Sequence, residues 1–398
     1  MINSNLKGKR LLIQGAGRGN LGLIKTAKEN GIITIVTGLK GDYPCLPLAD
    51  KICYVDIKDV EGVFKVAVTN NIDGAVICCS DTGLHAVGIC NDRLGLCGLS
   101  EKSAILSFNK DKMKETLIKN GVRTAPYYKV EDYEQLKTVV NLLKYPIIIK
   151  AIDLQGSRGI NIVYENKGLL EAFQQVMEQT NENFCIVEKF LEGKEYGAQA
   201  FIYNNEVLFV LPHGDETVMC RTLVPIGHYF PLELSTELYE DTKIQIERAI
   251  KALGLNNCPV NIDLIEVDGK AYIIELTGRV GANCLPELVG KYFGINYYDM
   301  ILNTVLGGNP IPIFNSHKKP SATIARMIKS IKSGTLLQFS IPTLPDTEIQ
   351  MFLKSGDRVN TFTNCNDVIG QIIVVGSTLA ECEAKIKIAE ENIDLVII

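Results

Sequence analysis

The sequence predicts a multidomain protein of the α/β and α+β classes. From residue 8 to about residue 98, short apolar runs alternate with amphipathic stretches, a rhythm typical of a parallel sheet with helices on both faces. Further along, two pairs of apolar runs are joined by the turns Asn204-Asn205 and Asp268-Gly269, which indicates antiparallel hairpins. A chain of 398 residues is long enough for several such domains.

The first predicted domain covers residues 1–105 and contains the expected strands RLLIQG, IITIVT, KICYVD, DGAVICCS and LGLCG. Ligands on such sheets bind beyond the carboxyl ends of the strands, where the glycine turn 15–22 and the segment 80–85 fall. The turn contains G-x-G-x-x-G, but the second strand ends in Thr37 and Gly38 and lacks the acid that would hold a nicotinamide ribose. Dinucleotide binding therefore ranks last among the expectations.

The rest of the chain divides into a second domain, residues 106–314, and a C-terminal α/β lobe, residues 315–398. A helical segment at about 100–120, closed by Gly121, joins the first two domains. Strands and helices alternate over about 120–190, which predicts a small lid lobe, and the two hairpins with a helix near 235–254 fall in the lobe 191–314. The C-terminal lobe is expected to close with a strand and a helix.

Composition disfavours several classes of protein. The net charge of −5 and the absence of a basic stripe argue against a nucleic-acid partner. No apolar run reaches the roughly 18 residues of a membrane-spanning helix, and MINSNLKGKR lacks the apolar segment of a secretory signal. The twelve cysteines are scattered without a C-x-x-C pair, which favours reduced thiols. We therefore expect a cytoplasmic protein that acts on small molecules and contacts no membrane.

The hairpin closed by Asp268-Gly269 carries the most informative residues. Counting back from the turn places Asp263 and Glu275 on adjacent strands, pointing towards a common face. Two facing carboxylates repel each other unless a cation lies between them, and Mg²⁺ binds through one or two carboxylates together with substrate phosphates. Arg279, four residues past Glu275, suits contact with a phosphoryl or carboxylate oxygen. A solvated strand pair with a salt bridge is the alternative.

A lysine followed by a glycine loop forms a second candidate site, in YPIIIKAIDLQGSRGINIV at 145–163. Lys150 closes an apolar strand, and Gly156, Ser157 and Gly159 can offer backbone N–H groups to phosphate oxygens. The loop joins two strands and is not G-x-x-x-x-G-K-[ST], so it is not a P-loop. A lysine that simply extends to solvent is the alternative.

Two acidic residues, Glu188 and Glu195, flank an apolar hinge in IVEKFLEGKEYG at 186–197. A segment of this kind can supply what adenosine requires: backbone groups for the edge of the base, apolar walls for its faces and a carboxylate for the ribose. Two solvated acids at the ends of strands are the alternative. The segment is therefore a candidate nucleotide site.

In this order and spacing, the candidate residues resemble the ATP-grasp superfamily, in its carboxylate–amine ligase branch. The motifs that carry the resemblance are Lys112 in NKDKMKETL, Lys150, GSRG, VEKFLEGKEYG, and Asp263 followed by ELTGR. The likeness covers nearly the whole chain. It implies a Rossmann-like N-terminal domain, a two-lobed ATP-grasp domain and a small C-terminal lobe like that of biotin-carboxylase-type members.

The resemblance also implies roles for individual residues. Lys112 and Lys150 would contact the phosphates and the adenine side of ATP. The mobile loop over the phosphates would consist of Gly156, Ser157, Arg158 and Gly159. The adenine would be read by Glu188 with the backbone of Lys189, Phe190 and Leu191, and the ribose would be held by Glu195. Asp263 and Glu275 would bind magnesium, and Arg279 would steady the transferred phosphoryl group or the acyl phosphate.

One residue departs from the family pattern. The superfamily usually has E-x-N-x-R on the second magnesium strand, where this chain has Thr277, whose hydroxyl reaches less far than an amide oxygen. The run ELTGRVGANCLPEL still resembles amino-acid ligases, which makes Gly281 and Asn283 candidates for substrate contact. PIGHYFPLEL resembles a segment near their acceptor pocket, so His228 is a candidate substrate contact or base, and Arg221 a candidate carboxylate clamp. A structural histidine and a solvated arginine are the alternatives.

The activity implied by the resemblance is Mg·ATP-dependent joining of a carboxylate to an amine or ammonia. The carboxylate would attack the γ-phosphorus, ADP would leave, and the amine would capture the acyl phosphate as an amide. The expected cofactors are ATP and Mg²⁺, with Mn²⁺ as the substitute metal, and the expected assembly is a homodimer. A carboxylase of the biotin-carboxylase or purine-pathway type, which activates bicarbonate, and a non-catalytic ATP-binding protein are the alternatives.

Overall fold

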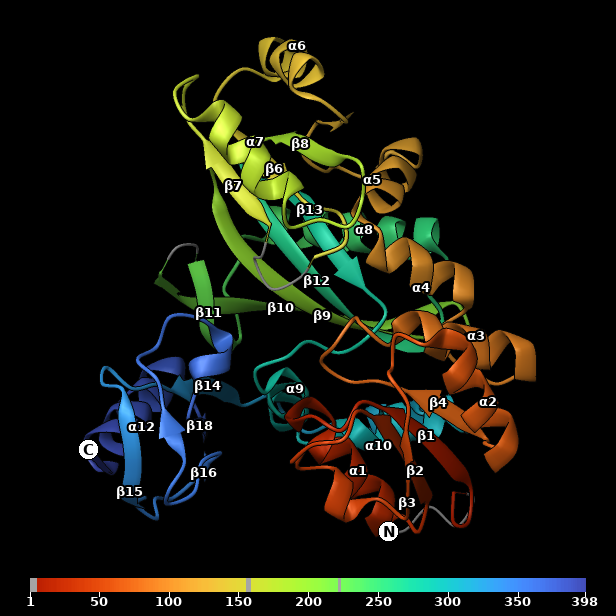
Figure 1. The fold of residues 1–398 in the computed structure, drawn as a ribbon. Helices are drawn as coiled ribbons and strands as arrows, with labels where there is room; N and C mark the ends of the chain where they lie inside the picture. The colour runs from red at the N-terminus through yellow and green to blue at the C-terminus, as the bar shows by residue number, and fades with distance from the viewer. Residues whose placement is uncertain (1–5, 155–158, 221–222) are drawn as a thin grey trace.

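The structure, a computed structural model, describes residues 6–154, 159–220 and 223–398. Strands of these residues form four sheets. Figure 1 shows the N-terminal sheet at one end of the molecule, the lid lobe at the other, and long central strands between them with the C-terminal segment at their side. The predicted multidomain architecture of the α/β and α+β classes is confirmed. None of the described helices is both long enough and apolar enough to cross a membrane.

The N-terminal sheet is parallel, with the strand order β3-β2-β1-β4. Its elements are β1 (Arg10–Gln14), α1 (Leu21–Glu29), β2 (Ile33–Gly38), β3 (Lys51–Tyr54), α2 (Val60–Asn70), β4 (Gly74–Val76) and α3 (Leu84–Leu94), with short 3-10 turns at Arg18–Asn20 and Leu46–Leu48. Leu11 and Ile13 share a core with α1 and α10 (Tyr297–Val305), whereas Leu12 shares another with α2 and α3. Successive residues of a strand point to opposite faces, so helices cover both faces of this sheet, as predicted.

The fifth strand predicted for this sheet, LGLCG at 94–98, is not a strand in the structure. Gly95 has a φ of 64°, and the N–H of Leu96 donates to the carbonyl of Asn91. A left-handed glycine with this bond closes the C-terminus of a helix. The short apolar run therefore belongs to the cap of α3, and the strand prediction is wrong.

The lid lobe is a four-stranded antiparallel sheet with the order β5-β8-β6-β7. Its elements are β5 (Tyr127–Val130), α6 (Tyr133–Leu143), β6 (Ile147–Lys150), β7 (Ile160–Val163), α7 (Leu169–Met177) and β8 (Cys185–Lys189). Both helices share one apolar core with the strands. The predicted helical segment before the lobe is two helices, α4 (Glu101–Phe108) and α5 (Lys110–Lys119), because the side chain of Asn109 accepts the N–H of Lys112 and caps α5.

Long central strands form an eight-stranded sheet with the order β13-β12-β9-β10-β11-β14-β18-β16. Its first five strands and the helices near them are β9 (Lys194–Tyr203), β10 (Glu206–Met219), β11 (Leu223–Phe230), α8 (Thr236–Leu253), β12 (Cys258–Val267), β13 (Lys270–Thr277), α9 (Leu285–Phe293) and α11 (Ile311–Asn315). Both predicted hairpins, β9–β10 and β12–β13, are confirmed. Their central turn residues all have positive φ, from 50° at Asp268 to 71° at Gly269.

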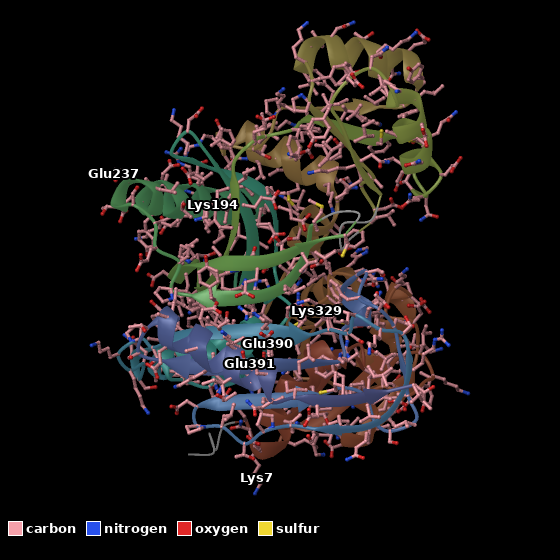
Figure 2. The ribbon with its side chains drawn as sticks, turned by 90° about the vertical axis from the view of Figure 1, so that its left-hand side faces the viewer. Lys7, Lys194, Glu237, Lys329, Glu390 and Glu391 are labelled. Atoms are coloured by element: carbon pink, nitrogen blue, oxygen red, sulfur yellow. The ribbon has the colours of Figure 1, made fainter. Side chains whose placement is uncertain are left out.

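The C-terminal segment contributes three strands to this sheet, β14, β18 and β16, and its other three form a separate sheet with the order β17-β15-β19. Its elements are β14 (Ala322–Ile328), β15 (Gly334–Ser340), β16 (Thr347–Met351), β17 (Arg358–Val359), a 3-10 turn at Cys365–Asp367, β18 (Gly370–Gly376), α12 (Leu379–Glu391) and β19 (Asp394–Ile397). β14 pairs with β11, so the segment continues the central strands. Figure 2 shows Glu390 and Glu391 on α12, and Arg326 of β14 pairs with both Glu390 and Glu216 of β10. The expected final helix is followed by one more strand.

Candidate active site

One polar row crosses four strands of the central sheet. Glu275 of β13 pairs directly with Asp263 of β12, Asp263 with Gly197 of β9, and Gly197 with His213 of β10. Residues opposite each other on neighbouring strands project from the same face. Asp263 and Glu275 therefore face each other, as expected, but a plain count from the turn would put Ile274 opposite Asp263, and a β-bulge beside Asp263 brings Glu275 there instead. His213 lies on the same face.

The facing carboxylates fit a hard divalent cation. Burial and the Glu275 carboxylate raise the pKa of Asp263 to about 8, which shows the cost of holding two acids together without a counterion. Lys110, the first residue of α5, lies 3.3 Å from Glu275 and supplies some positive charge. Thr277 is buried, and its hydroxyl lies near Asp81, whose pKa it helps to lower. The oxygen-only set of Asp263, Glu275 and Thr277 suits Mg²⁺.

A chain of amides positions Asp263. The backbone N–H of Gly281 donates to Gln199, the Gln199 amide donates to Asn261 at 2.7 Å, and the Asn261 amide donates to Asp263 at 3.1 Å. Gln199 is fully buried, and a Cβ at Gly281 would overlap both Leu285 and Asn261. Gly281 therefore has a positional role in the site. Gln199 and Asn261 were not predicted, and their positions two residues from Gly197 and Asp263 on the same strands are the signal that could have identified them.

A second cluster joins α5 to the lid lobe. Glu188 of β8 accepts ion pairs from Lys114 at 3.3 Å and Lys150 at 3.2 Å, and all three side chains are buried. The two lysines outweigh the effect of burial and lower the pKa of Glu188. Its other oxygen, Oε1, has no partner among the described residues. Lys150 and Glu188, predicted separately, are thus brought together.

The structure does not bring Lys112 into this cluster. Lys112 lies on the exposed side of α5, and its backbone N–H is used in the Asn109 cap. Lys114, two residues on, points inwards to Glu188 and Thr124. Two positions on a helix differ by more than half a turn, so the neighbouring lysine cannot take the same place.

Several predicted residues fall outside the described part of the chain. Gly156, Ser157 and Arg158 of the glycine loop and Arg221 of the β10–β11 connection belong to this group. At the edge of the loop, Gly159 has a φ of 63° and its carbonyl accepts the N–H of Ala151 at 2.8 Å. The hydrogen bond between Ala151 and Gly159 therefore joins the two sides of the loop.

The expected adenine segment has part of its backbone already engaged. The N–H groups of Lys189 and Phe190 donate to the carbonyls of Pro126 and Pro146. A purine would therefore use other backbone groups here, and Leu191, which follows β8, is the next residue. Glu195 of β9 is exposed, with no ion pair within the described residues.

Arg279 lies in a buried ion pair. Its guanidinium donates to both oxygens of Asp81, at 2.6 Å and 3.0 Å, and to the carbonyl of Val280 at 3.2 Å. Burial alone would lower the pKa of Arg279, but the Asp81 carboxylate raises it above the usual value. Asp81 follows β4, in the segment 80–85 expected to face a ligand. The pair joins the end of the β12–β13 hairpin to the N-terminal domain.

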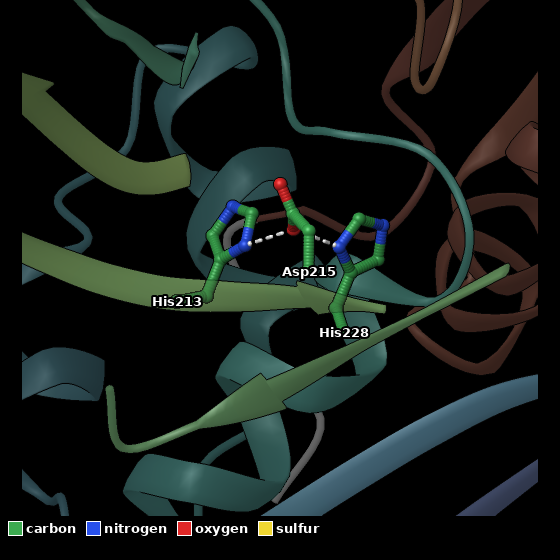
Figure 3. Close-up of side chains that lie close together, drawn as sticks. All are labelled: His213, Asp215 and His228. Carbon is green, nitrogen blue, oxygen red and sulfur yellow. Dashed lines mark hydrogen bonds and ion pairs between the residues drawn. The ribbon is translucent and has the colours of Figure 1, made fainter. Parts of the chain in front are cut away.

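The predicted histidine belongs to a cluster of three side chains. His228 of β11 and His213 of β10 each bring Nδ1 to the same oxygen of Asp215, at 2.6 Å and 2.9 Å (Figure 3). The two histidines are buried. His213 and Asp215 were not predicted, and alternation along β10 on the face of His228 is the signal that could have identified them.

A cavity of about 490 Å³ lies at the carboxyl ends of the N-terminal strands. It is lined by the glycine turn, the end of β4 and residues 56–58, among others. The side-chain nitrogen of Gln14, which is fully buried at this cavity, has no partner among the described residues. Cys79 connects the cavity wall to the catalytic hairpin because its N–H donates to the carbonyl of Val280. Asn283 has a φ of 52° beside this junction, with no hydrogen bond within the described residues.

Known proteins share this arrangement. Residues 108–220 match the family model of the phosphoribosylglycinamide synthetase ATP-grasp (A) domain. The chain is 46% identical to a solved phosphoribosylglycinamide synthetase from Anaerococcus prevotii, over 98% of this chain and 100% of that one, with a TM-score of 0.88. The chain belongs to the ATP-grasp superfamily.

Other ATP-grasp relatives differ in length. A formate-dependent phosphoribosylglycinamide formyltransferase from Prochlorococcus marinus is 24% identical over 90% of this chain and 93% of its own. A carbamoyl phosphate synthase large chain from Pseudothermotoga lettingae is 23% identical over 87% of this chain, which spans only 32% of that relative. This chain also covers only 60% of the length of the first curated relative. ATP-grasp membership implies binding of ATP and Mg²⁺.

Proposed function

We propose that this chain, an ATP-dependent ligase of the ATP-grasp superfamily, joins a small-molecule carboxylate to an amine through an acyl phosphate. The observation that carries the proposal is the pairing of Asp263 with Glu275 on the central sheet, together with Lys114, Lys150 and Glu188 at the lid. A divalent cation and two lysines are what a triphosphate needs for charge neutralisation during phosphoryl transfer. The relatives named for phosphoribosylglycinamide synthesis support this class of reaction.

In this proposal the magnesium ion is held by Asp263 and Glu275, with Thr277 as a third oxygen. Its chemistry is to neutralise the phosphate oxygens of ATP. Asn261 and Gln199 keep the Asp263 carboxylate in one orientation. Mn²⁺ accepts the same oxygen ligands and would be the substitute metal.

The nucleotide would bind between the lid lobe and the central sheet. Lys150 and Lys114 would bind the phosphates, Glu188 would hold both lysines in place, and the backbone near Leu191 would read the base. Glu195 would hold the ribose, and the lid lobe would close over the phosphates. Closure would keep water from the acyl phosphate.

The carboxylate substrate would enter from the cavity of the N-terminal domain. Gln14 offers a buried donor there, and the N-termini of α1 and α3 favour an anion. Arg279, fixed by Asp81, would stand at the boundary between this cavity and the metal site and steady the acyl phosphate. Gly281 and Asn283 would line the same boundary.

ADP release by the purified protein tests the proposal. We would supply Mg·ATP with pooled carboxylates, including amino acids, and with ammonia, pooled amines or bicarbonate, and we would include phosphoribosylamine with glycine because of the relatives. ADP that requires a carboxylate and an amine together supports the ligase, and Glu275→Gln should abolish it. Glu266→Gln, on the same hairpin but away from the carboxylate pair, is the matched control. Bicarbonate-driven ADP without an amine would indicate a carboxylase, and ATP binding without turnover would contradict the ligase.

A further inference from the structure

The His213–Asp215–His228 cluster has a defined hydrogen-bond arrangement. The two histidines hold the pKa of Asp215 well below its usual range despite burial, so Asp215 is a carboxylate that can only accept hydrogen bonds. Both Nδ1 atoms must therefore donate to it. Burial lowers the pKa of His213, and a neutral imidazole that donates through Nδ1 has an acceptor at Nε2.

These Nε2 atoms have no partner in the described part of the chain. Nε2 of His213 is buried without a hydrogen bond, and none is formed by Nε2 of His228. A buried acceptor without a donor costs about 1–3 kcal/mol. The other histidines differ: His85 lies near Glu101 on the surface, and His317 contacts the carbonyl of Phe314. Among the described histidines, His213 is the one whose unpartnered ring nitrogen is buried.

The cluster lies next to the metal site in the sheet. The ring of His213 covers Gly197, where a Cβ would overlap both Nε2 and Cε1, and Gly197 lies between His213 and Asp263 in the sheet. Asp215 is close enough to help raise the pKa of Asp263. Figure 3 shows both imidazoles on the same side of their strands, each turning one nitrogen to Asp215.

We propose that His213, Asp215 and His228 form the binding site for the ammonium group of the amine substrate, and that His228 accepts its proton. This inference rests on the proposed ligase function and assigns the position of its second substrate. An ammonium ion has only donors and a positive charge, so it satisfies bare imidazole acceptors beside a carboxylate. The charged groups near this cluster include the acids Asp263, Glu275 and Glu195 and the cations Lys110, Arg279 and Lys150.

The proton transfers balance as follows. One ammonium proton passes to Nε2 of His228, and the nitrogen lone pair attacks the acyl carbon. The N–C bond forms, the bond from the acyl carbon to the phosphate oxygen breaks, and the second proton leaves with the phosphate. Asp215 stabilises the imidazolium through Nδ1 and acts as a positioning residue.

A metal ion is the other ligand that these three side chains could take. The distances of 2.6 Å and 2.9 Å between Nδ1 and the Asp215 oxygen are those of hydrogen bonds. A metal at the same point would have to displace both Nδ1 protons. The hydrogen-bonded geometry therefore favours the ammonium group.

Imidazole NMR tests binding independently of turnover. In ¹⁵N-histidine-labelled protein the four histidines can be assigned by single substitutions. We expect the Nε2 resonances of His213 and His228 to be those of unprotonated nitrogens. Methylammonium chloride should shift these resonances, whereas tetramethylammonium chloride should not. His317 should not respond. Protonated Nε2 atoms in both rings, no response to methylammonium, or a stoichiometric metal that is absent from Asp215→Asn would overturn the proposal.

Kinetics then test proton transfer, with the carboxylate and amine that support ADP release. For His228→Gln we expect kcat with the ammonium-type substrate to fall about 100-fold. Hydroxylamine is neutral at pH 7 and needs no proton acceptor, so it should still capture the acyl phosphate at a rate within about threefold of the unmodified enzyme. Asp215→Asn should raise the amine KM about tenfold and leave the carboxylate KM unchanged, and Asp215→Glu should restore part of the loss. His317→Gln is the control.

The outcomes separate this inference from the proposed function. If no carboxylate and amine pair releases ADP, the ligase proposal fails whatever the NMR result. Suppose instead that the unmodified enzyme releases ADP normally. If His228→Gln then slows the reactions with hydroxylamine and with the amine equally, or slows neither reaction, the ligase proposal stands and the proton-accepting role of His228 is wrong. Thermal unfolding of each variant shows whether the cluster only supports the fold.

Discussion

Arg279 and Asp81 form a two-point ion pair that joins the end of the catalytic hairpin to the N-terminal domain. Both side chains are about nine-tenths buried, at 11% and 10% exposure. Because an isolated buried charge is costly, Asp81→Asn should lower the free energy of unfolding by about 3 kcal/mol. Chemical denaturation measures this change. The exposed pair Arg93–Glu61 is the control, since Glu61→Gln should cost less than about 1 kcal/mol, and equal effects would contradict the prediction.

The raised pKa of Asp263 predicts a pH-dependent stability in the absence of a divalent cation. Its pKa is about 8 in the folded protein, against about 3.9 in an unfolded chain. The folded state therefore binds the extra proton, so the stabilising contribution present below about pH 4 is lost as the pH rises towards 8. The slope from this group cannot exceed about 1.4 kcal/mol per pH unit. Thermal unfolding in EDTA should show a decline that Asp263→Asn reduces.

Addition of Mg²⁺ provides the control for that experiment. A cation between Asp263 and Glu275 removes their repulsion, so the melting temperature at pH 8 should rise for the unmodified protein and much less for Asp263→Asn. A decline with pH that is the same in both proteins would show that other groups cause it.

Lys114 and Lys112 give a matched pair for nucleotide binding. Lys114→Met removes one of the two cations paired with Glu188 and should weaken ATP binding at least about tenfold. Lys112→Met, on the exposed side of the same helix, should change it by less than about twofold. Calorimetric titration with Mg·ATP compares them. A larger effect at Lys112 would mean that α5 turns when the nucleotide binds.

Gly197→Ala tests the close contact between Gly197 and His213. The added methyl group would overlap the imidazole ring, so we expect a loss of about 1–3 kcal/mol in stability and a displaced His213. The double variant Gly197→Ala/His213→Ala should recover stability because the ring is gone. Denaturation of both variants measures this, and a stable single variant would show that the ring has room to move.

Local signals explain what could be predicted from the sequence. Asn204-Asn205 and Asp268-Gly269 tolerate positive φ, so both hairpins followed from turn chemistry alone. The opposition of Asp263 and Glu275 also depends on a β-bulge beside Asp263, which the turn does not predict. The run at 94–98 failed because a short apolar stretch with glycines fits a strand and a helix cap equally well.

The rest of the site depends on contacts between distant strands. Gln199 and Asn261 lie 62 positions apart, and their hydrogen bond follows only from the register of β9 and β12. The contact between Asp215 and His228 depends on the register of β10 and β11, which places these two residues opposite each other. Spacing alone does not distinguish Lys114 from Lys112, and it does not reveal the β-bulge that brings Glu275 opposite Asp263. The register between strands that are distant in the chain is a tertiary property, and local sequence patterns do not predict it.

The pairing of β14 with β11 has a consequence for how this protein can be divided. A truncation near residue 315 would uncover the hydrogen-bonding edge of β11 along Gly227–Phe230, the strand that carries His228. Unprotected edges recruit other strands, so such a fragment would tend to aggregate. The C-terminal segment thus protects the edge of β11 from pairing with other chains, and expression trials should keep this segment attached.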